Sequence, residues 1–166
     1  MKYLLVTSLV AVITGCASRP PQKPVPGEAI DFSLPVWASN QPHSFTQDVG
    51  HIVVLDAWAS WCAPCKAELP QLDALAKQWA SQGVRVYAAS IDTDPEAVQP
   101  YLMAMHIDLP ILLDPGGAML TRMLGLQNMP TTWVFDKAGH LVFTQQGNAA
   151  LIAEKVNGML SRPDSL

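Results

Sequence analysis

A pair of cysteines separated by two residues, directly after a strongly apolar run, limits what this chain can fold into. The sequence reads Trp61-Cys62-Ala63-Pro64-Cys65. The run over residues 52–58 is almost continuously apolar and rich in β-branched residues, which is typical of a buried parallel strand. After the second cysteine, apolar residues recur at helical spacing. The pair is therefore predicted at the junction between a central strand and a helix over about 63–81.

That junction favours redox chemistry at Cys62. The first turn of a helix has backbone N–H groups without helical partners and the positive end of the helix dipole. Both stabilise a thiolate, so we expect Cys62 to be the attacking nucleophile. Cys65, one turn further along, is expected to face the core and to resolve the mixed disulfide. One cycle of closing and opening this disulfide moves two electrons and two protons.

Three other uses of the cysteine pair fit the sequence less well. A structural zinc site needs a second pair of ligands at suitable spacing, but the remaining cysteine is Cys16 and the histidines are scattered. Covalent haem attachment needs a histidine directly after the second cysteine, where this chain has Lys66. A purely structural disulfide across so short a loop would constrain little of the unfolded chain. We therefore predict no metal and no other cofactor.

Three separated features together resemble the thioredoxin superfamily. They are the motif over residues 61–70, Asp56 six residues before Cys62, and the segment Met129-Pro130-Thr131-Thr132. The closer similarity is to the extracytoplasmic, membrane-tethered branch of TlpA/ResA-like thiol–disulfide oxidoreductases, which are grouped with the redoxin/AhpC-TSA domains. The resemblance covers about residues 27–160, and the three features agree in order and spacing.

The resemblance also implies the architecture. We expect one α/β domain over residues 27–162 with the thioredoxin fold, in which a mixed central sheet has helices on both faces. A helix and a strand between about 94 and 113 match the insertion found in this branch. The remaining patterns predict a turn over 40–43, strands over 44–46, 84–91, 109–113, 132–135 and 141–144, a helix over 118–124, and a last helix capped by Asn148.

Two acidic residues near the cysteines are candidate proton-handling groups. Asp56 interrupts the apolar run, and a buried carboxylate costs free energy unless it has a partner or a function. Burial is expected to raise its pKa toward neutrality, where it can shuttle a proton for Cys65, as the resemblance to the buried aspartate of thioredoxin also implies. Glu68 follows Cys65 by one helical turn, and the resemblance implies that it tunes the pKa and reactivity of the dithiol. The alternatives are a solvent-facing Asp56 on an edge strand and a solvated Glu68.

Met129-Pro130 is the second chemical landmark. In the superfamily the matching peptide bond is cis and lies against the cysteines, so we expect a cis bond here. It would expose the backbone of Met129 as an edge to which an incoming peptide adds as a strand. Trp61, Met129 and Pro130 are therefore the predicted substrate-binding residues. The alternative is a trans turn that only precedes the next strand.

The N-terminus has the composition of an export signal. A basic residue precedes an apolar stretch over 3–13 that is too short to span a membrane. The small residues before Cys16 resemble a bacterial lipobox, which implies a lipoprotein signal peptide over 1–15 and a lipid on Cys16. The proline-rich residues 16–26 then form an extended tether. Ser18, rather than an aspartate, slightly favours the outer membrane, and an ordinary signal peptide is the alternative.

The predicted function is thiol–disulfide exchange with protein substrates on the periplasmic side of the cell envelope. No histidine lies between the cysteines, as it tends to in strong oxidants, and the nearby Asp56 and Glu68 oppose a very acidic thiol. Both points favour a reductant. The resemblance implies reduction of envelope protein disulfides, including those of apocytochrome c, with electrons supplied by an integral-membrane thiol-reductant transporter.

Two functions of other classes stay open. A thiol peroxidase would keep its peroxide turnover when Cys65 is replaced. A copper-binding chaperone of thioredoxin fold would space its cysteines by three residues and add a distant histidine ligand. The chain has 10 basic and 14 acidic residues and no basic patch, so a nucleic-acid partner is not expected. We expect a monomer.

Overall fold

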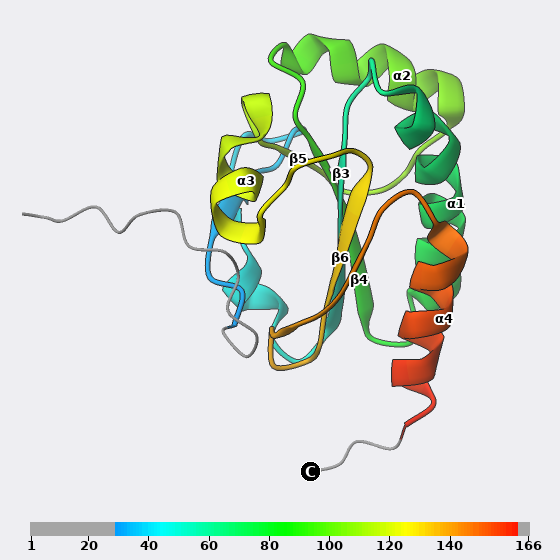
Figure 1. The fold of residues 1–166 in the computed structure, drawn as a ribbon. Helices are drawn as coiled ribbons and strands as arrows, with labels where there is room; N and C mark the ends of the chain where they lie inside the picture. The colour runs from blue at the N-terminus through cyan, green and yellow to red at the C-terminus, as the bar shows by residue number, and fades with distance from the viewer. Residues whose placement is uncertain (1–28, 163–166) are drawn as a thin grey trace, which may run out of the picture.

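A computed structural model describes residues 29–162, in which five strands form one mixed sheet (Figure 1). The strands are β3 (Ile52–Trp58), β4 (Val84–Ser90), β5 (Ile111–Leu113), β6 (Thr131–Phe135) and β7 (Leu141–Gln145). Their order across the sheet is β5-β4-β3-β6-β7. The first three strands are parallel, whereas β6 and β7 each run antiparallel to the preceding strand in this order.

The predicted central strand is confirmed as β3, and all of its residues are buried. It pairs with β4 on one side and with β6 on the other, and helices cover both faces. A strand buried on both faces has no solvent side, which explains its near-continuous apolar sequence. The pairing register places Asp56 opposite Ala88 and Thr132. Asp56 therefore lies in the interior of the sheet and not at an edge.

One face of the sheet is covered by α1 (Ala63–Trp79) and α4 (Ala149–Leu160), with α2 (Val98–Met105) at one end. Their apolar side chains join those of β3 and β4 in a core that includes both Cys62 and Cys65. The predicted helix after the cysteines is confirmed, although it ends two residues earlier than expected.

The opposite face carries a second core, which lies under elements from two parts of the chain. As on the first face, buried apolar side chains of the helix and strands meet those of the sheet. The predicted arrangement of a mixed sheet with helices on both faces is therefore confirmed. The covering elements are β1 (Ser33–Pro35), β2 (Pro42–Ser44), the 3-10 turn η1 (Phe45–Asp48), the 3-10 turn η3 (Pro115–Gly117) and α3 (Ala118–Leu124).

The prediction of a strand over residues 44–46 is wrong. β2 ends at Ser44, and the chain then turns into η1. Phe45 is fully buried and packs against Phe32, with 4.9 Å between the ring centroids. The apolar residue at this position therefore marks one aromatic anchor in the second core and not the alternation of a strand.

The predicted insertion is present as the 3-10 turn η2 (Pro95–Ala97), followed by α2 and β5. Tyr101 of α2 donates its hydroxyl to the carbonyl oxygen of Lys66 at 3.2 Å. Its ring lies 5.2 Å from that of Trp58, measured between centroids. The insertion thus packs against the first turn of α1.

The described chain begins at the end of the sheet opposite the cysteines. The N–H of Ile30 donates to the carbonyl oxygen of Gly139 at 2.8 Å, and Ala29 forms a bridge with His140. Both partners belong to the turn between β6 and β7, at the N-terminal end of β3, whereas Cys62 follows its C-terminal end. The predicted signal peptide, tether and Cys16 lie outside the described residues.

Candidate active site

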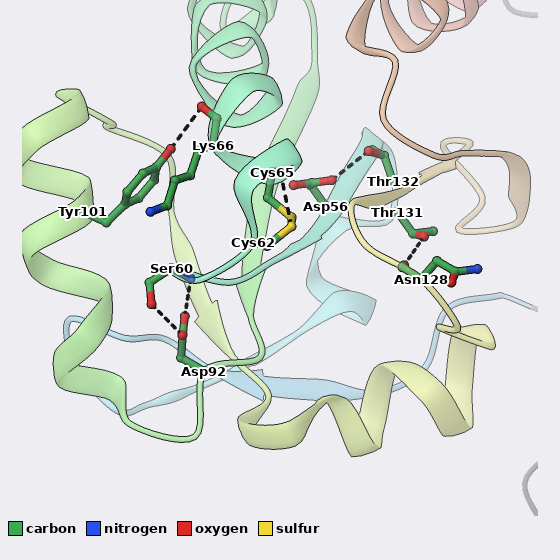
Figure 2. Close-up of a disulfide and its surroundings, with 10 residues drawn as sticks. All are labelled: Asp56, Ser60, Cys62, Cys65, Lys66, Asp92, Tyr101, Asn128, Thr131 and Thr132. Carbon is green, nitrogen blue, oxygen red and sulfur yellow. Dashed lines mark hydrogen bonds between the residues drawn. A yellow bond between two sulfur atoms is a disulfide. The ribbon is translucent and has the colours of Figure 1, made fainter.

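Cys62 and Cys65 form a disulfide at the start of α1 (Figure 2). Cys62 is the N-cap residue, and its Sγ accepts a hydrogen bond from the backbone N–H of Cys65 at 3.3 Å. Pro64 occupies the first turn, where no helical N–H bond is needed. The predicted strand-to-helix junction is confirmed, and it directs a backbone donor at the sulfur of Cys62.

The two cysteines differ in their access to solvent. The exposed fraction is 6% for Cys62 and 1% for Cys65. The side chain of Trp61, directly before the disulfide, is 66% exposed. An incoming molecule therefore meets Trp61 first and reaches Cys62 more readily than Cys65.

The Met129–Pro130 peptide bond is cis, as predicted. Met129 is half-buried and packs against the core that contains both cysteines. The hydroxyl of Thr131 donates to the carbonyl oxygen of Asn128 at 2.7 Å and thereby closes the loop around the proline. The proline loop and the cysteine pair therefore lie at the same end of the sheet (Figure 2).

Asp56 is fully buried, and its carboxyl group points toward the disulfide in Figure 2. Its Oδ1 accepts a 2.8 Å hydrogen bond from the hydroxyl of Thr132, whereas its Oδ2 has no partner among the described residues. Burial raises the pKa of Asp56 well above its ordinary range, and the charge of Glu68 raises it further, while the Thr132 hydrogen bond opposes the shift.

Glu68 is the second buried carboxyl group, and it is 4% exposed. Neither of its oxygens forms a hydrogen bond with a described residue. Burial raises its pKa, and the nearby backbone amide of Asn148, which does not reach hydrogen-bond geometry, lowers it by a smaller amount. Glu68 and Asp56 are therefore two buried carboxyl groups whose pKa values are both raised, and the charge of Glu68 contributes to the shift of Asp56.

A third acidic residue near the cysteines was not anticipated from the sequence. Asp92, just after β4, is 3% exposed, and its carboxylate accepts hydrogen bonds from Ser60 and Ser90. The signal available in the sequence was weak, because a polar residue after a strand is common at loop starts. Asp92 and Ser60 are brought together only by the pairing of β3 with β4.

No group of three or more potential metal-ligating side chains occurs among residues 29–162. Within the same range, no helix has the length and apolar character needed to cross a bilayer. The site as described consists of a disulfide, two protonatable carboxyl groups, a cis-proline loop and an exposed tryptophan.

Comparison with known proteins agrees with this geometry. Residues 25–144, most of the chain, match the model of the AhpC/TSA family. The chain belongs to the AhpC/TSA family. The predicted resemblance to thioredoxin-like redox domains is therefore confirmed at the level of the family.

Among curated proteins, the chain is similar to two thiol–disulfide oxidoreductases. It is 29% identical to ResA of Bacillus thuringiensis over 93 residues, which is 56% of this chain and 53% of that protein. It is 25% identical to sporulation thiol-disulfide oxidoreductase A of Bacillus subtilis over 156 residues, 87% of each chain. The chain thus matches about half the length of ResA.

Among solved structures, the chain is similar to that of a proposed thiol:disulfide interchange protein DsbE from Chlorobium tepidum. The TM-score is 0.76 at 24% sequence identity, with 84% of this chain and all of that chain covered. At this identity the comparison confirms the thioredoxin-like fold, and what the chain does with it is argued from the site.

Proposed function

We propose that this protein is an extracytoplasmic thiol–disulfide oxidoreductase that acts on protein substrates, with Cys62 as nucleophile and Cys65 as resolving cysteine. The observation that carries the proposal is the hydrogen bond from the Cys65 N–H to Cys62 Sγ at the start of α1. A donor held at this point stabilises negative charge on sulfur without any rearrangement. The difference in exposure between the two cysteines supports the same order of attack.

In the reducing direction, the proposed cycle starts from the dithiol. The Cys62 thiolate attacks one sulfur of a substrate disulfide, and the other substrate sulfur leaves as a thiolate and takes up a proton. Cys65 loses its proton and attacks Cys62 Sγ, which releases the second substrate thiol. The substrate gains two electrons and two protons, and the protein ends with the Cys62–Cys65 disulfide.

The proton of Cys65 needs an acceptor, and we assign that role to Asp56. A buried carboxyl group with a raised pKa exchanges a proton near neutral pH more readily than an ordinary aspartate does. Its unpartnered Oδ2 is free of competing hydrogen bonds among the described residues. Glu68 would act through Asp56, because its charge raises the pKa of that carboxyl group.

We assign substrate binding to the loop around Pro130 and to Trp61. An extended peptide would add to the backbone edge at Met129 as a further strand. The exposed indole of Trp61, directly before Cys62 in the chain, offers an apolar contact.

The proposed direction is reduction. Asp56 and Glu68 both disfavour a strongly stabilised thiolate when ionised, and a stabilised thiolate is what makes a dithiol protein a strong oxidant. An exported reductant needs electrons from across the membrane, so the proposal includes an integral-membrane thiol transporter as donor. Lipid attachment at Cys16, a periplasmic location and a role in cytochrome c maturation are narrower parts of the same proposal.

The test combines a trapping experiment with a measured reduction potential. Reduced Cys65→Ser protein mixed with a disulfide-bonded protein should accumulate a mixed disulfide, whereas Cys62→Ser should form none. A potential near −270 mV, about that of thioredoxin, identifies a reductant, and one near −120 mV overturns the proposed direction. Absence of any mixed disulfide would overturn the exchange mechanism.

A thiol peroxidase is the second candidate, which the AhpC/TSA match favours. It predicts that purified Cys65→Ser protein continues to consume hydrogen peroxide in the presence of a small thiol. Exchange through the disulfide predicts that the same variant loses turnover. One assay therefore separates the two functions.

A further inference from the structure

The buried carboxylate of Asp92 binds the turn that leads into Cys62. Oδ2 of Asp92 accepts a 2.9 Å hydrogen bond from the backbone N–H of Ser60, and Oδ1 accepts a 2.8 Å hydrogen bond from the Ser60 hydroxyl (Figure 2). Ser90 fixes the carboxylate in turn. Its hydroxyl donates to Oδ2 at 2.8 Å and accepts from the Asp92 N–H at 3.1 Å.

Ser60 stands two residues before Cys62. The turn between them is closed by one backbone hydrogen bond, from the N–H of Cys62 to the carbonyl oxygen of Ala59 at 3.0 Å. Trp61 projects into solvent, so it adds little packing that would hold the turn in place. Among the described residues, the two bonds from Ser60 to Asp92 are therefore the side-chain hydrogen bonds that restrain residues 59–61.

The partners of the Asp92 carboxylate show which segment it stabilises. An aspartate at the start of a loop commonly caps the segment that follows it. Here none of the hydrogen bonds to the Asp92 carboxylate comes from the following segment, where Asp94 caps η2 instead. Burying a carboxylate costs free energy, and this one is compensated largely by bonds to the cysteine-bearing turn.

We infer that Asp92 is a positioning residue that acts through Ser60 to hold Cys62 against the N–H of Cys65 and to present Trp61 to the substrate. The inference rests on the proposed function for its consequence in turnover, but its effect on the Cys62 sulfur is independent of any substrate. Loss of the restraint lets the turn drift from the helix end, so the thiolate of Cys62 is less well stabilised.

Two substitutions at Asp92 separate position from charge. Asp92→Asn removes the negative charge but can keep the geometry, because its oxygen accepts from the Ser60 N–H and its amide donates to the Ser60 hydroxyl. Asp92→Ala removes both. Asp56, Glu68 and Lys66, the other charged or titratable groups near the cysteines, are unchanged in both variants. A difference between the two variants therefore reports position alone.

The experiment measures the rate at which iodoacetamide alkylates Cys62 in the reduced, full-length protein across pH. We expect Asp92→Ala to react at least about threefold more slowly than Asp92→Asn at neutral pH, with its midpoint shifted to higher pH. The kcat/KM for a protein disulfide should fall about tenfold in Asp92→Ala and stay near the wild-type value in Asp92→Asn.

Asp114→Ala is the matched control. Asp114 is also a buried aspartate, but its carboxylate accepts from the backbone N–H groups of Met119 and Leu120 at the start of α3. This variant should lose stability without changing the alkylation profile of Cys62. A merely structural role for Asp92 predicts that the two alanine variants behave alike.

Equal alkylation rates for Asp92→Ala and Asp92→Asn would overturn the inference. If Asp92→Ala does not fold, Ser60→Ala replaces it in the experiment, because it removes the hydroxyl bond to Asp92. An alkylation profile of Ser60→Ala identical to that of the wild type would also overturn the inference. If the wild-type protein turns over no protein disulfide while the two Asp92 variants still differ in alkylation, the proposed function fails and the positioning role of Asp92 stands.

Discussion

The hydroxyl of Thr132 on β6 donates a 2.8 Å hydrogen bond to Oδ1 of Asp56 on β3, next to the redox-active pair. The two residues lie directly opposite each other in the sheet. This bond stabilises the ionised form of Asp56, whereas burial and Glu68 stabilise the protonated form. The protonation of Asp56 is thus set by three contributions, and single substitutions remove two of them, the charge of Glu68 and the hydroxyl of Thr132.

Stability should depend on pH through Asp56. Its pKa is raised in the folded protein, so between about pH 4 and that raised value the folded state binds more protons than the unfolded state. Stability therefore falls as the pH rises through this window. In Asp56→Asn we expect this decline to be smaller and the stability at neutral pH to rise, because no carboxyl group then has to ionise in the buried site.

Urea unfolding of the oxidised protein at a series of pH values measures this effect. The part of the decline that remains in Asp56→Asn should belong to Glu68, whose pKa is raised in the same direction. If Asp56→Asn and the wild type have identical pH profiles, ionising the Asp56 carboxyl group costs the folded protein little free energy, which would contradict the prediction.

Removing the Thr132 hydroxyl should shift the same titration upward. Thr132→Val keeps the shape of the side chain but deletes the hydrogen bond that favours ionised Asp56. We expect the pKa of Asp56 to rise further, and the pH window of declining stability to extend to higher pH. Thr132→Ser retains the hydroxyl and should titrate like the wild type. An unchanged or lower pKa in Thr132→Val would contradict the assigned bond.

Glu68→Gln should have the opposite effect on Asp56. The variant removes the neighbouring charge that raises the pKa of Asp56, so that pKa should fall. Less negative charge beside the dithiol should also let Cys62 ionise at lower pH, which thiolate absorbance at 240 nm would follow. Glu154→Gln, on the exposed side of α4, is the control and should change neither titration. If Glu68→Gln leaves both titrations in place, Glu68 has no tuning role.

Two tyrosines whose hydroxyls have different acceptors allow the contribution of the hydrogen bond to Asp48 to be measured. The hydroxyl of Tyr87 donates to the buried carboxylate of Asp48 at 2.9 Å, whereas that of Tyr101 donates to a backbone carbonyl near the surface. We expect Tyr87→Phe to lower the free energy of unfolding by roughly 1.5–3 kcal/mol and Tyr101→Phe by about 1 kcal/mol or less. Urea denaturation compares the two, and an equal loss would mean that the Asp48 carboxylate is satisfied without Tyr87.

Asp48 binds three side chains, one from β2 and two from β4. His43 contacts its Oδ2 at 2.8 Å, and Arg85 and Tyr87 contact its Oδ1. No sequence pattern indicated this cluster, since Asp48 and Tyr87 are 39 residues apart and meet only in the folded chain.

Features with a local signature were predictable from the sequence. The apolar run marked β3, the cysteine spacing marked the start of α1, and Met129-Pro130 marked the second loop of the site. Asp56 was predictable as a buried carboxyl group because it interrupts an apolar run, and a buried strand is one of the few places where such a residue stands out.

Features that depend on tertiary contacts were not predictable. Ser60 and Asp92 are 32 residues apart, and each alone is an ordinary loop residue. The hydrogen bond from Thr132 to Asp56 spans 76 residues and follows from the pairing of β3 with β6. The strand expected over 44–46 failed for the same reason, because Phe45 owes its burial to Phe32 and not to a local period.

The first described residues pair with the turn between β6 and β7, where the N–H of Ile30 bonds to Gly139. The disulfide lies at the opposite end of the sheet. If the protein is tethered through the residues before Ala29, the tether enters the described domain at the end of the sheet opposite the disulfide. A tether that enters there would leave the end of the sheet with Cys62 and Trp61 open to partner proteins.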